Sequence, residues 1–262
     1  MVFAARRPTQ EELERYYAAY PRYENVPAVT RSRYRELLDT FAPYRRTNRI
    51  LDIGCGVGTF LDEAKQAGWD TYGTEFAARA LEIVRARGIT AIQAPLTLDT
   101  FEPGFFDVIS AFEVFEHVPD PRAESAVIAH ALRPGGLLYC TTPNFNSASR
   151  RLLRGRWSVV SYPEHLCYFT PSTLKRWLSG SGFEAVSITS TGFSLTRLRE
   201  SVTRTAGHAA PGACEDDRLR EAIERSNSLR LVKNAVNTTL SALGAGDTLK
   251  GRFELRSTAT GS

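Results

Sequence analysis

Short apolar runs alternate with amphipathic segments from residue 49 to about residue 190, and one more apolar run lies near the C-terminus. Runs of this length between glycine-containing turns are typical of buried strands, and the segments between them repeat with the spacing of helices. The pattern predicts strands at 49–53, 69–75, 89–93, 105–112, 137–142, 183–190 and 247–255, and helices at 58–67, 77–87, 121–132 and 171–180. Thr170 is the expected N-cap of the last of these helices. This alternation predicts an α/β fold with a mostly parallel sheet and helices on both faces.

The segment before the first of these strands is polar and rich in tyrosine. We expect helices at 9–19 and 28–41 within it, separated by a proline-containing stretch. These helices would form a lid, because aromatic faces favour a cationic ligand and closure excludes water. Ordinary helix packing is the alternative role for the four tyrosines that would face the pocket, Tyr16, Tyr17, Tyr20 and Tyr23.

The chain then divides into four parts. Residues 1–48 are the lid, and residues 49–192 are the core, whose acceptor side is formed by 143–170. Residues 193–246 form a helical insertion with an amphipathic stretch at 216–243. The last strand and the tail occupy 247–262.

The composition of the 262-residue chain is that of an ordinary globular protein, with 42% hydrophobic and 24% charged residues. A net charge of +4 is too small to indicate a nucleic-acid partner. No apolar run approaches the roughly 18–20 residues that cross a bilayer, so we expect no transmembrane segment. The first residues lack the apolar stretch of a secretion signal, and the four cysteines form no CxxC pair. We therefore expect a cytoplasmic protein.

A glycine-rich loop follows the first strand of the core. Glycines at 54, 56 and 58 let the backbone turn sharply and let a ligand approach it closely. A dinucleotide-binding loop would have its third glycine at position 59, where Thr59 stands, and the Gly-Lys-Ser/Thr of a phosphate-binding loop is absent. The loop therefore favours a ligand without phosphates at the usual crevice of an open α/β sheet.

Two carboxylates accompany this loop. Asp52 lies directly before it, where its charge would repel a pyrophosphate and attract an amino group. Glu75 ends the second strand, 21 residues after Gly54, and at this spacing an acidic residue can accept hydrogen bonds from both ribose hydroxyls. An adenosine joined to a cationic amino acid has this chemistry, which predicts S-adenosylmethionine as cofactor.

The ordered segments ILDIGCGVGTF, Glu75, FFDVISAFEVFEHVPDP and LRPGGLLYCTTPN resemble class I S-adenosylmethionine-dependent methyltransferases. Within them the chain is most similar to the broad group that contains ubiquinone-biosynthesis O-methyltransferases. The resemblance covers about residues 49–190. It implies a Rossmann-like, seven-stranded, mostly parallel sheet whose last strand, 247–255, is reversed.

The resemblance also implies a set of cofactor-binding residues. Asp52 and two of the loop glycines would line the methionine moiety, Glu75 would hold the ribose, and Leu96 would flank the adenine. The complete set is Asp52, Gly54, Cys55, Gly56, Glu75, Phe76, Leu96 and Phe112.

Glu113, Glu116 and His117 directly follow the fourth strand of the core. In a helical turn their spacing would put all three on one face, at the carboxyl edge of the sheet. Three roles remain open: His117 as general base, with Glu116 beside it as a catalytic candidate; all three as ligands of magnesium; or a structural role in the cofactor pocket. His165 is the second candidate base, with Glu164 as the residue that orients it.

Four arginines lie within the acceptor-side segment, at 150, 151, 154 and 156. They could bind a phosphate or carboxylate of the acceptor. A solvated face or a peripheral contact with anionic lipid headgroups is the alternative.

These observations predict an enzyme that transfers a methyl group from S-adenosylmethionine to a hydroxyl of a small-molecule or sugar acceptor, in glycan, lipid-linked or secondary-metabolite biosynthesis. An amine acceptor is the close alternative. RNA or protein methylation, or a cofactor-binding scaffold without activity, would be a different class of function. The sequence leaves a monomer and a homodimer equally open.

Overall fold

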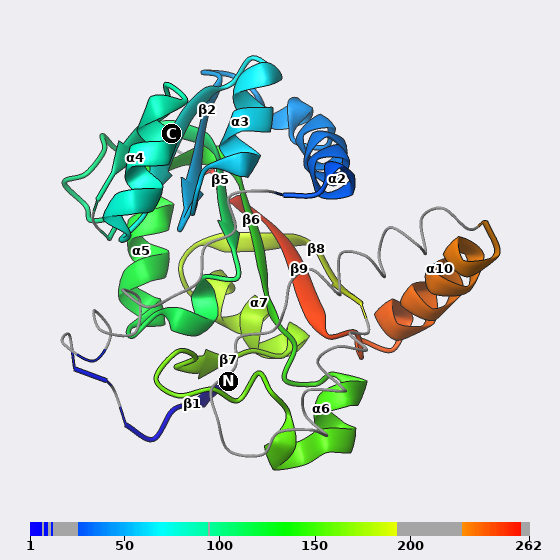
Figure 1. Ribbon diagram of the computed structural model, residues 1–262. Helices are drawn as coiled ribbons and strands as arrows, with labels where there is room; N and C mark the ends of the chain where they lie inside the picture. Colours follow the sequence, from blue (N-terminus) through cyan, green and yellow to red (C-terminus); the bar gives the residue numbers. More distant parts are fainter. Residues whose placement is uncertain (7, 10–11, 13–25, 94, 193–226, 258–262) are drawn as a thin grey trace.

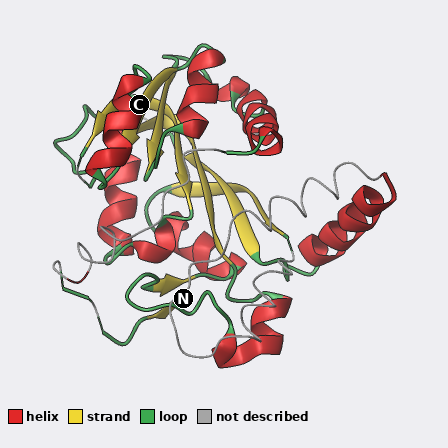
Figure 2. Cartoon of the chain, in the orientation of Figure 1, coloured by secondary structure: helices red, strands yellow, loops and turns green. Residues whose placement is uncertain are grey.

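A seven-stranded sheet runs through the centre of the computed structural model, with helices on both of its faces (Figures 1 and 2). The structure describes residues 1–262 except 7, 10–11, 13–25, 94, 193–226 and 258–262. The strands of this sheet are β2 (Arg49–Ile53), β3 (Asp70–Thr74), β4 (Thr90–Ile92), β5 (Phe106–Phe112), β6 (Leu132–Pro143), β8 (Phe183–Thr191) and β9 (Thr248–Leu255). The α-helices are α2 (Ala28–Asp39), α3 (Thr59–Gln66), α4 (Ala78–Ala86), α5 (Pro121–Ala131), α6 (Ala148–Leu153), α7 (Pro171–Ser179) and α10 (Asn227–Ala242).

The strand order is β4-β3-β2-β5-β6-β9-β8. Neighbours from β4 to β6 are parallel, and β9 is antiparallel to both β6 and β8. The expected reversed last strand is therefore confirmed. The strand order reverses at β2. The chain first adds β3 and β4 on one side of β2 and then crosses to β5 on the other side. Such a switch point leaves a crevice at the carboxyl ends of the strands.

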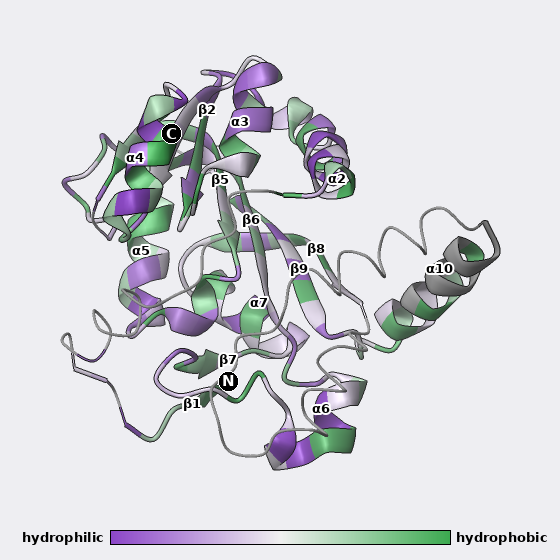
Figure 3. Ribbon diagram, in the orientation of Figure 1, coloured by the Kyte–Doolittle hydropathy of each residue, from purple (hydrophilic) through white to green (hydrophobic). Residues whose placement is uncertain are grey.

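Alternate positions of the strands build two separate hydrophobic cores. Ile50 of β2 and Val108 of β5 point to the face covered by α2, α3 and α4. Leu51 and Ile109 point to the opposite face, which α5 and α7 cover. Helices α3 and α4 carry both hydrophobic and hydrophilic residues around their circumference, as a helix with one buried face requires (Figure 3). Both faces of β2 and β5 are thus buried, which explains their continuous apolar sequences.

Capping residues begin the helices on the second face. The side chain of Asp120 accepts hydrogen bonds from two backbone N–H groups at the start of α5. The expected N-cap Thr170 forms a capping box with Thr173 at the start of α7. Both helices have proline at their first position, where its missing N–H has no cost.

Three parts of the structure differ from the expectation or extend it. Strand β6 begins at Leu132, directly after α5, whereas the sequence predicted a turn there and a strand at 137–142. A register shift opposite Phe106 and Val108 accommodates the extra residues. Helix α6 was not predicted, and neither was β1 (Val2–Phe3), which pairs antiparallel with β7 (Cys167–Tyr168).

The N-terminal residues thus lie along the acceptor-side segment, where the backbone N–H of Ala4 also donates to the carbonyl of Leu166. Helix α2 matches the second predicted helix of the lid. The first one, at 9–19, lies mostly outside the described residues, and the four tyrosines of the lid lie wholly outside them. Most of the predicted insertion lies outside them as well.

Candidate active site

The glycine-rich loop joins β2 to α3 at the carboxyl edge of the sheet. Gly54 and Gly56 have φ of +66° and +54°, in the region that favours glycine. A Cβ added to Gly56 would meet nothing within 4 Å, so the backbone here borders open space. A Cβ on Gly54 would lie 3.0 Å from a methyl group of Val114. The loop therefore presents bare backbone to a ligand and packs directly against the segment that follows β5.

Asp52 and Glu75 flank this loop, as the sequence predicted. Glu75 accepts hydrogen bonds from the backbone N–H of Gly56 at 3.0 Å and of Ala77 at 2.8 Å, so it ties the loop to the start of α4. Asp52 is buried and accepts a hydrogen bond from Ser110 Oγ at 2.7 Å. Burial raises the pKa of Asp52 to about 8, the bond from Ser110 opposes that rise, and the negative charge of Glu75 adds to it. A carboxyl group in this state gains from a cationic ligand.

The four other predicted cofactor residues occupy different environments. The thiol of Cys55 is turned inward, because a Cβ on Gly73 would lie only 2.7 Å from it. Burial raises the pKa of this thiol, so it stays protonated and only the backbone of Cys55 is left to face a ligand. Phe76 is exposed and Leu96 is buried in the core. Phe112 is half-buried and packs against Phe60, with ring centroids 5.0 Å apart.

Tyr34 of α2 was not predicted as a site residue. Its ring contacts those of Phe60 and Phe112, at centroid distances of 5.4 and 5.7 Å. Burial, with the nearby negative charge of Asp52, raises the pKa of Tyr34 to about 12. Tyr34 therefore lies over the same crevice as the carboxylate. The sequence could not single out Tyr34, because it is one of several tyrosines in the N-terminal segment.

Helix α2 is held in this position by ion pairs with α3. Arg31 and Arg35 donate to the buried carboxylate of Glu63 at 2.7 and 2.8 Å, and Arg31 also reaches Asp62 at 3.1 Å. These pairs place Tyr34, which lies between the two arginines in sequence, over the start of α3.

The segment after β5 does not form the predicted continuous helical turn. Glu113 has a φ of +53° and precedes a short 3₁₀-helix, Phe115–His117. Glu116 is buried and accepts a hydrogen bond from Thr142 Oγ1 at 3.0 Å. Burial raises the pKa of Glu116 well above its usual range, and the neighbouring Glu113 adds to this.

His165 from the acceptor-side segment meets this group. The ring centroids of His117 and His165 are 4.9 Å apart. Each Nδ1 faces a carbonyl oxygen, that of Glu164 at 2.9 Å for His117 and that of Val159 at 2.6 Å for His165. A carbonyl only accepts, so both Nδ1 atoms carry hydrogen, and in the neutral rings Nε2 is the basic atom. The structure thus brings together both histidines that the sequence singled out.

The predicted metal ligands are rearranged. Glu116, His117 and His165 each offer an atom within 4.8 Å of the others, and in the part of the chain that the structure describes Glu113 does not belong to such a group. The side chain of Glu113 nevertheless lies beside that of Glu116, with which it forms a hydrogen bond, and its backbone N–H donates to the carbonyl of Thr141. Magnesium prefers oxygen ligands, so two imidazoles and one carboxylate do not fit it. We therefore assign no magnesium ion to this group of residues.

The crevice between these groups fits S-adenosylmethionine. It offers bare glycine backbone, two carboxylates and aromatic rings, which suit a ligand with hydroxyl groups and positive charge and without phosphates. Asp52 would hold the amino group and Glu75 the ribose. No helix formed by the described residues is long and apolar enough to cross a membrane.

Comparison with known proteins identifies the family to which the chain belongs. The family described as "Methyltransferase domain" matches residues 27–188. The chain is 30% identical over 154 residues to the ubiquinone biosynthesis O-methyltransferase of Idiomarina loihiensis, covering 53% of this chain and 63% of that protein. It is 29% identical over 168 residues to the enzyme of the same name from Xylella fastidiosa, covering 59% and 68%. The match to the Idiomarina enzyme is thus shorter than two thirds of its length.

Solved structures share the fold. The chain superimposes on an S-adenosylmethionine-dependent methyltransferase from Archaeoglobus fulgidus with a TM-score of 0.56 and 19% identity, covering 86% of this chain and 94% of the other. The strand order with its reversed β9, the glycine loop between two carboxylates and the extent of the family match lead to one conclusion. The chain belongs to the class I S-adenosylmethionine-dependent methyltransferases, whose methyl donor is S-adenosylmethionine.

Proposed function

We propose that this protein transfers a methyl group from S-adenosylmethionine to a hydroxyl of a small-molecule or sugar acceptor. The cofactor supplies a methyl group on a sulfonium, so an acceptor oxygen can form the new C–O bond as the C–S bond breaks and neutral S-adenosylhomocysteine leaves. The chain has to bind both molecules in line and to take the proton of the hydroxyl. The single observation that carries the proposal is the pair His117–His165 at the edge of the crevice.

His165 is the better placed of the two to act as general base. Its Nδ1 donates to the carbonyl of Val159, which leaves Nε2 to accept a proton. Glu164 Oε1 lies 4.0 Å from this Nε2 and would stabilise the imidazolium that forms. Burial, together with the nearby His165, lowers the pKa of His117 to about 4, which makes His117 a weak base. We assign proton removal to His165 and positioning of its ring to His117.

Two observations support a hydroxyl rather than an amine as acceptor. A hydroxyl needs a base to take its proton, whereas a neutral amine attacks without one, and the Nε2 of His165 can serve as that base. The curated relatives from Idiomarina and Xylella are both named O-methyltransferases. An N-methyltransferase would not require His165. The activity of His165→Asn therefore distinguishes O-methylation from N-methylation.

Calorimetric titration with S-adenosylhomocysteine tests the cofactor site first. Because Glu75 ties the loop to α4 and would accept hydrogen bonds from the ribose, Glu75→Gln should weaken binding about tenfold or more. Glu82→Gln on the exposed side of α4 is the matched control and should bind like wild type. Absence of binding by folded wild-type protein would contradict the proposal and leave a scaffold. If binding is found, a screen of hydroxyl and amine acceptors with labelled S-adenosylmethionine follows.

A further inference from the structure

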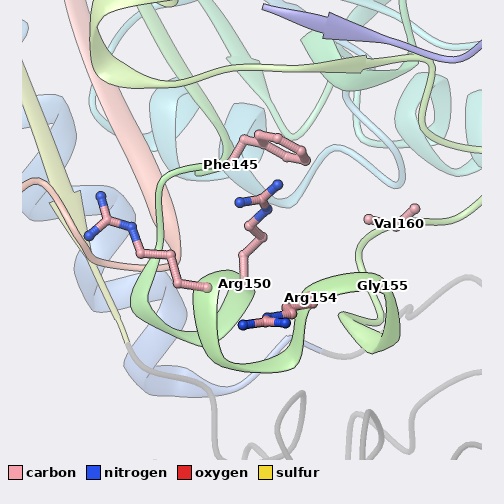
Figure 4. A pocket seen from close by; sticks show the side chains of 6 residues that line it. Phe145, Arg150, Arg154, Gly155 and Val160 are labelled. Carbon is pink, nitrogen blue, oxygen red and sulfur yellow. The ribbon is translucent and has the colours of Figure 1, made fainter.

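A pocket of about 540 Å³ opens beside α6, on the acceptor-side segment (Figure 4). Three of its six lining residues are arginines and none is acidic. They are Phe145, Arg150, Arg151, Arg154, Gly155 and Val160. A concave surface with several guanidinium groups suits an anion with multiple acceptor oxygens, such as a phosphate.

The protein positions these guanidinium groups without neutralising them. The guanidinium of Arg150 lies over the ring of Phe145, with its Cζ 4.0 Å from the centroid. Figure 4 shows the Arg150 side chain reaching toward this ring. Arg151 donates to Asn146 Oδ1 at 2.6 Å, which is an uncharged acceptor. Among the described residues, none of the three arginines of the pocket forms an ion pair with a carboxylate.

Arg154 stands where the backbone is strained. Its φ is +53° and its ψ −122°, a conformation that glycine adopts freely and other residues avoid. A glycine follows directly, at position 155, so a shift of one position would relieve the strain. A non-glycine residue in this conformation points to a functional role, here through its side chain in the pocket.

A row of aromatic rings connects the pocket to the histidine pair. The ring of Phe145 lies 5.4 Å from that of Tyr168, and Tyr168 lies 6.3 Å from His165. His165 in turn contacts His117. The backbone N–H of Phe145 also donates to Phe169, so the two stretches of the acceptor-side segment are held together. Tyr168 is buried, so these rings form a packed cluster with the pocket at one end and the histidine pair at the other. An acceptor with its phosphate in the pocket would have to extend along this cluster to place its hydroxyl at His165.

We propose that this pocket binds a phosphate or diphosphate group of the methyl acceptor, so that the acceptor is a phosphate ester. The inference rests on the proposed function, because it places the acceptor hydroxyl at His165. The half-buried Arg150, set against an aromatic ring at the wall of a concave pocket, favours one phosphate group held inside it over a flat membrane surface.

Calorimetric titration of the full chain with pyrophosphate, and separately with inorganic phosphate, tests the proposal. Saturable binding is expected, and it should weaken about tenfold or more in the double variant Arg150→Gln/Arg154→Gln. The matched control is Arg122→Gln/Arg176→Gln, which removes two exposed arginines elsewhere and should leave binding unchanged. All variants are also titrated with S-adenosylhomocysteine, whose affinity should be unaffected.

Three results would overturn the proposal. One is no saturable pyrophosphate binding by folded wild-type protein, and another is equal weakening in the control, which would show a general charge effect. The third is binding to phosphatidylglycerol vesicles that pyrophosphate does not displace, which would make the arginines a membrane contact. If the proposed function itself is wrong, folded wild-type protein will not bind S-adenosylhomocysteine. That result is distinct from the three above, which concern pyrophosphate and vesicle binding.

Discussion

The rings of His117 and His165 are in edge-to-face contact at 4.9 Å, although one histidine follows β5 and the other lies 48 residues later in the acceptor-side segment. Each Nδ1 is engaged by a backbone carbonyl, so both rings have a fixed orientation. The contact joins the segment that packs on the glycine loop to the segment that carries the arginine pocket.

His165→Asn should lower kcat about 10²–10⁴-fold, because proton removal from the hydroxyl loses its base. The affinity for S-adenosylhomocysteine should not change, which calorimetry checks on the same samples. His130→Asn on α5 is the control. If His165→Asn keeps its kcat and His117→Asn loses it, the assignment of the base is wrong.

Binding of S-adenosylhomocysteine should release a proton near neutral pH. Burial raises the pKa of Asp52 to about 8, so the free protein holds this carboxyl largely protonated at pH 7, and the ammonium of the ligand favours the ionised form. Affinity should therefore rise as pH increases toward 8 and level off above it. Titration calorimetry in two buffers of different ionisation enthalpy measures the release. A release of the same size in Asp52→Asn would assign the proton to another group.

Tyr34→Ala should weaken S-adenosylhomocysteine binding by about 1–2 kcal/mol, because it removes the ring that covers the crevice beside Phe60 and Phe112. Tyr34→Phe keeps the ring and should bind nearly as well as wild type. Fluorescence or calorimetric titration compares the three proteins. If Tyr34→Phe loses as much affinity as Tyr34→Ala, the hydroxyl and not the ring holds the ligand.

Arg133→Met should destabilise the fold by about 3–5 kcal/mol, because it leaves the buried carboxylate of Asp107 without its partner at 2.6 Å. Urea unfolding measures the change, with Arg122→Met as control. If the loss is no larger than in the control, the pair is not a stabilising contact.

The same pair predicts a dependence on acid. Burial raises the pKa of Asp107, but the bond from Arg133 and three backbone N–H donors outweigh it and lower the pKa below its usual value. The stabilisation is therefore complete above the unfolded-state pKa of about 4 and is lost as pH falls through the lowered folded-state value. Arg133→Met should lose less stability than wild type over that acid range. An identical acid profile for both proteins would contradict the role given to Arg133.

Arg154→Gly should raise the stability of the fold by about 1 kcal/mol while it weakens pyrophosphate binding, because glycine adopts the strained backbone conformation freely. Arg154→Ala removes the same guanidinium but keeps the strain, so it should weaken binding without the gain in stability. Thermal unfolding and pyrophosphate titration of both variants check this. Equal stability of the two variants would show that the backbone at this position carries no strain.

The sequence by itself determined the elements of the sheet and the cofactor crevice. Strand and helix patterns are local, and the carboxyl end of a parallel strand has a fixed place in an open sheet. Asp52, the glycine loop and Glu75 could therefore be proposed as cofactor residues from their positions at the carboxyl ends of β2 and β3. The class of cofactor followed from the chemistry of those residues, without any long-range contact.

Tertiary structure alone decided which distant residues meet. Glu113 lies beside Glu116 as expected, although its left-handed conformation breaks the assumed helical turn, and His165 joins Glu116 and His117 from a segment that the sequence could not place. Tyr34 contacts Phe60 and Phe112 from α2, which the ion pairs of Arg31 and Arg35 with Glu63 hold against α3.

The arginine pocket likewise combines a feature visible in the sequence with one that only the folded chain provides. The sequence displayed four arginines within a short stretch, and nothing local distinguishes a solvated face from a pocket. Its concave shape depends on α6, which the pattern did not predict, and on the packing of Phe145 against Tyr168. Such contacts join segments far apart in sequence, so they are fixed by the packing of the whole chain and not by its local periodicity.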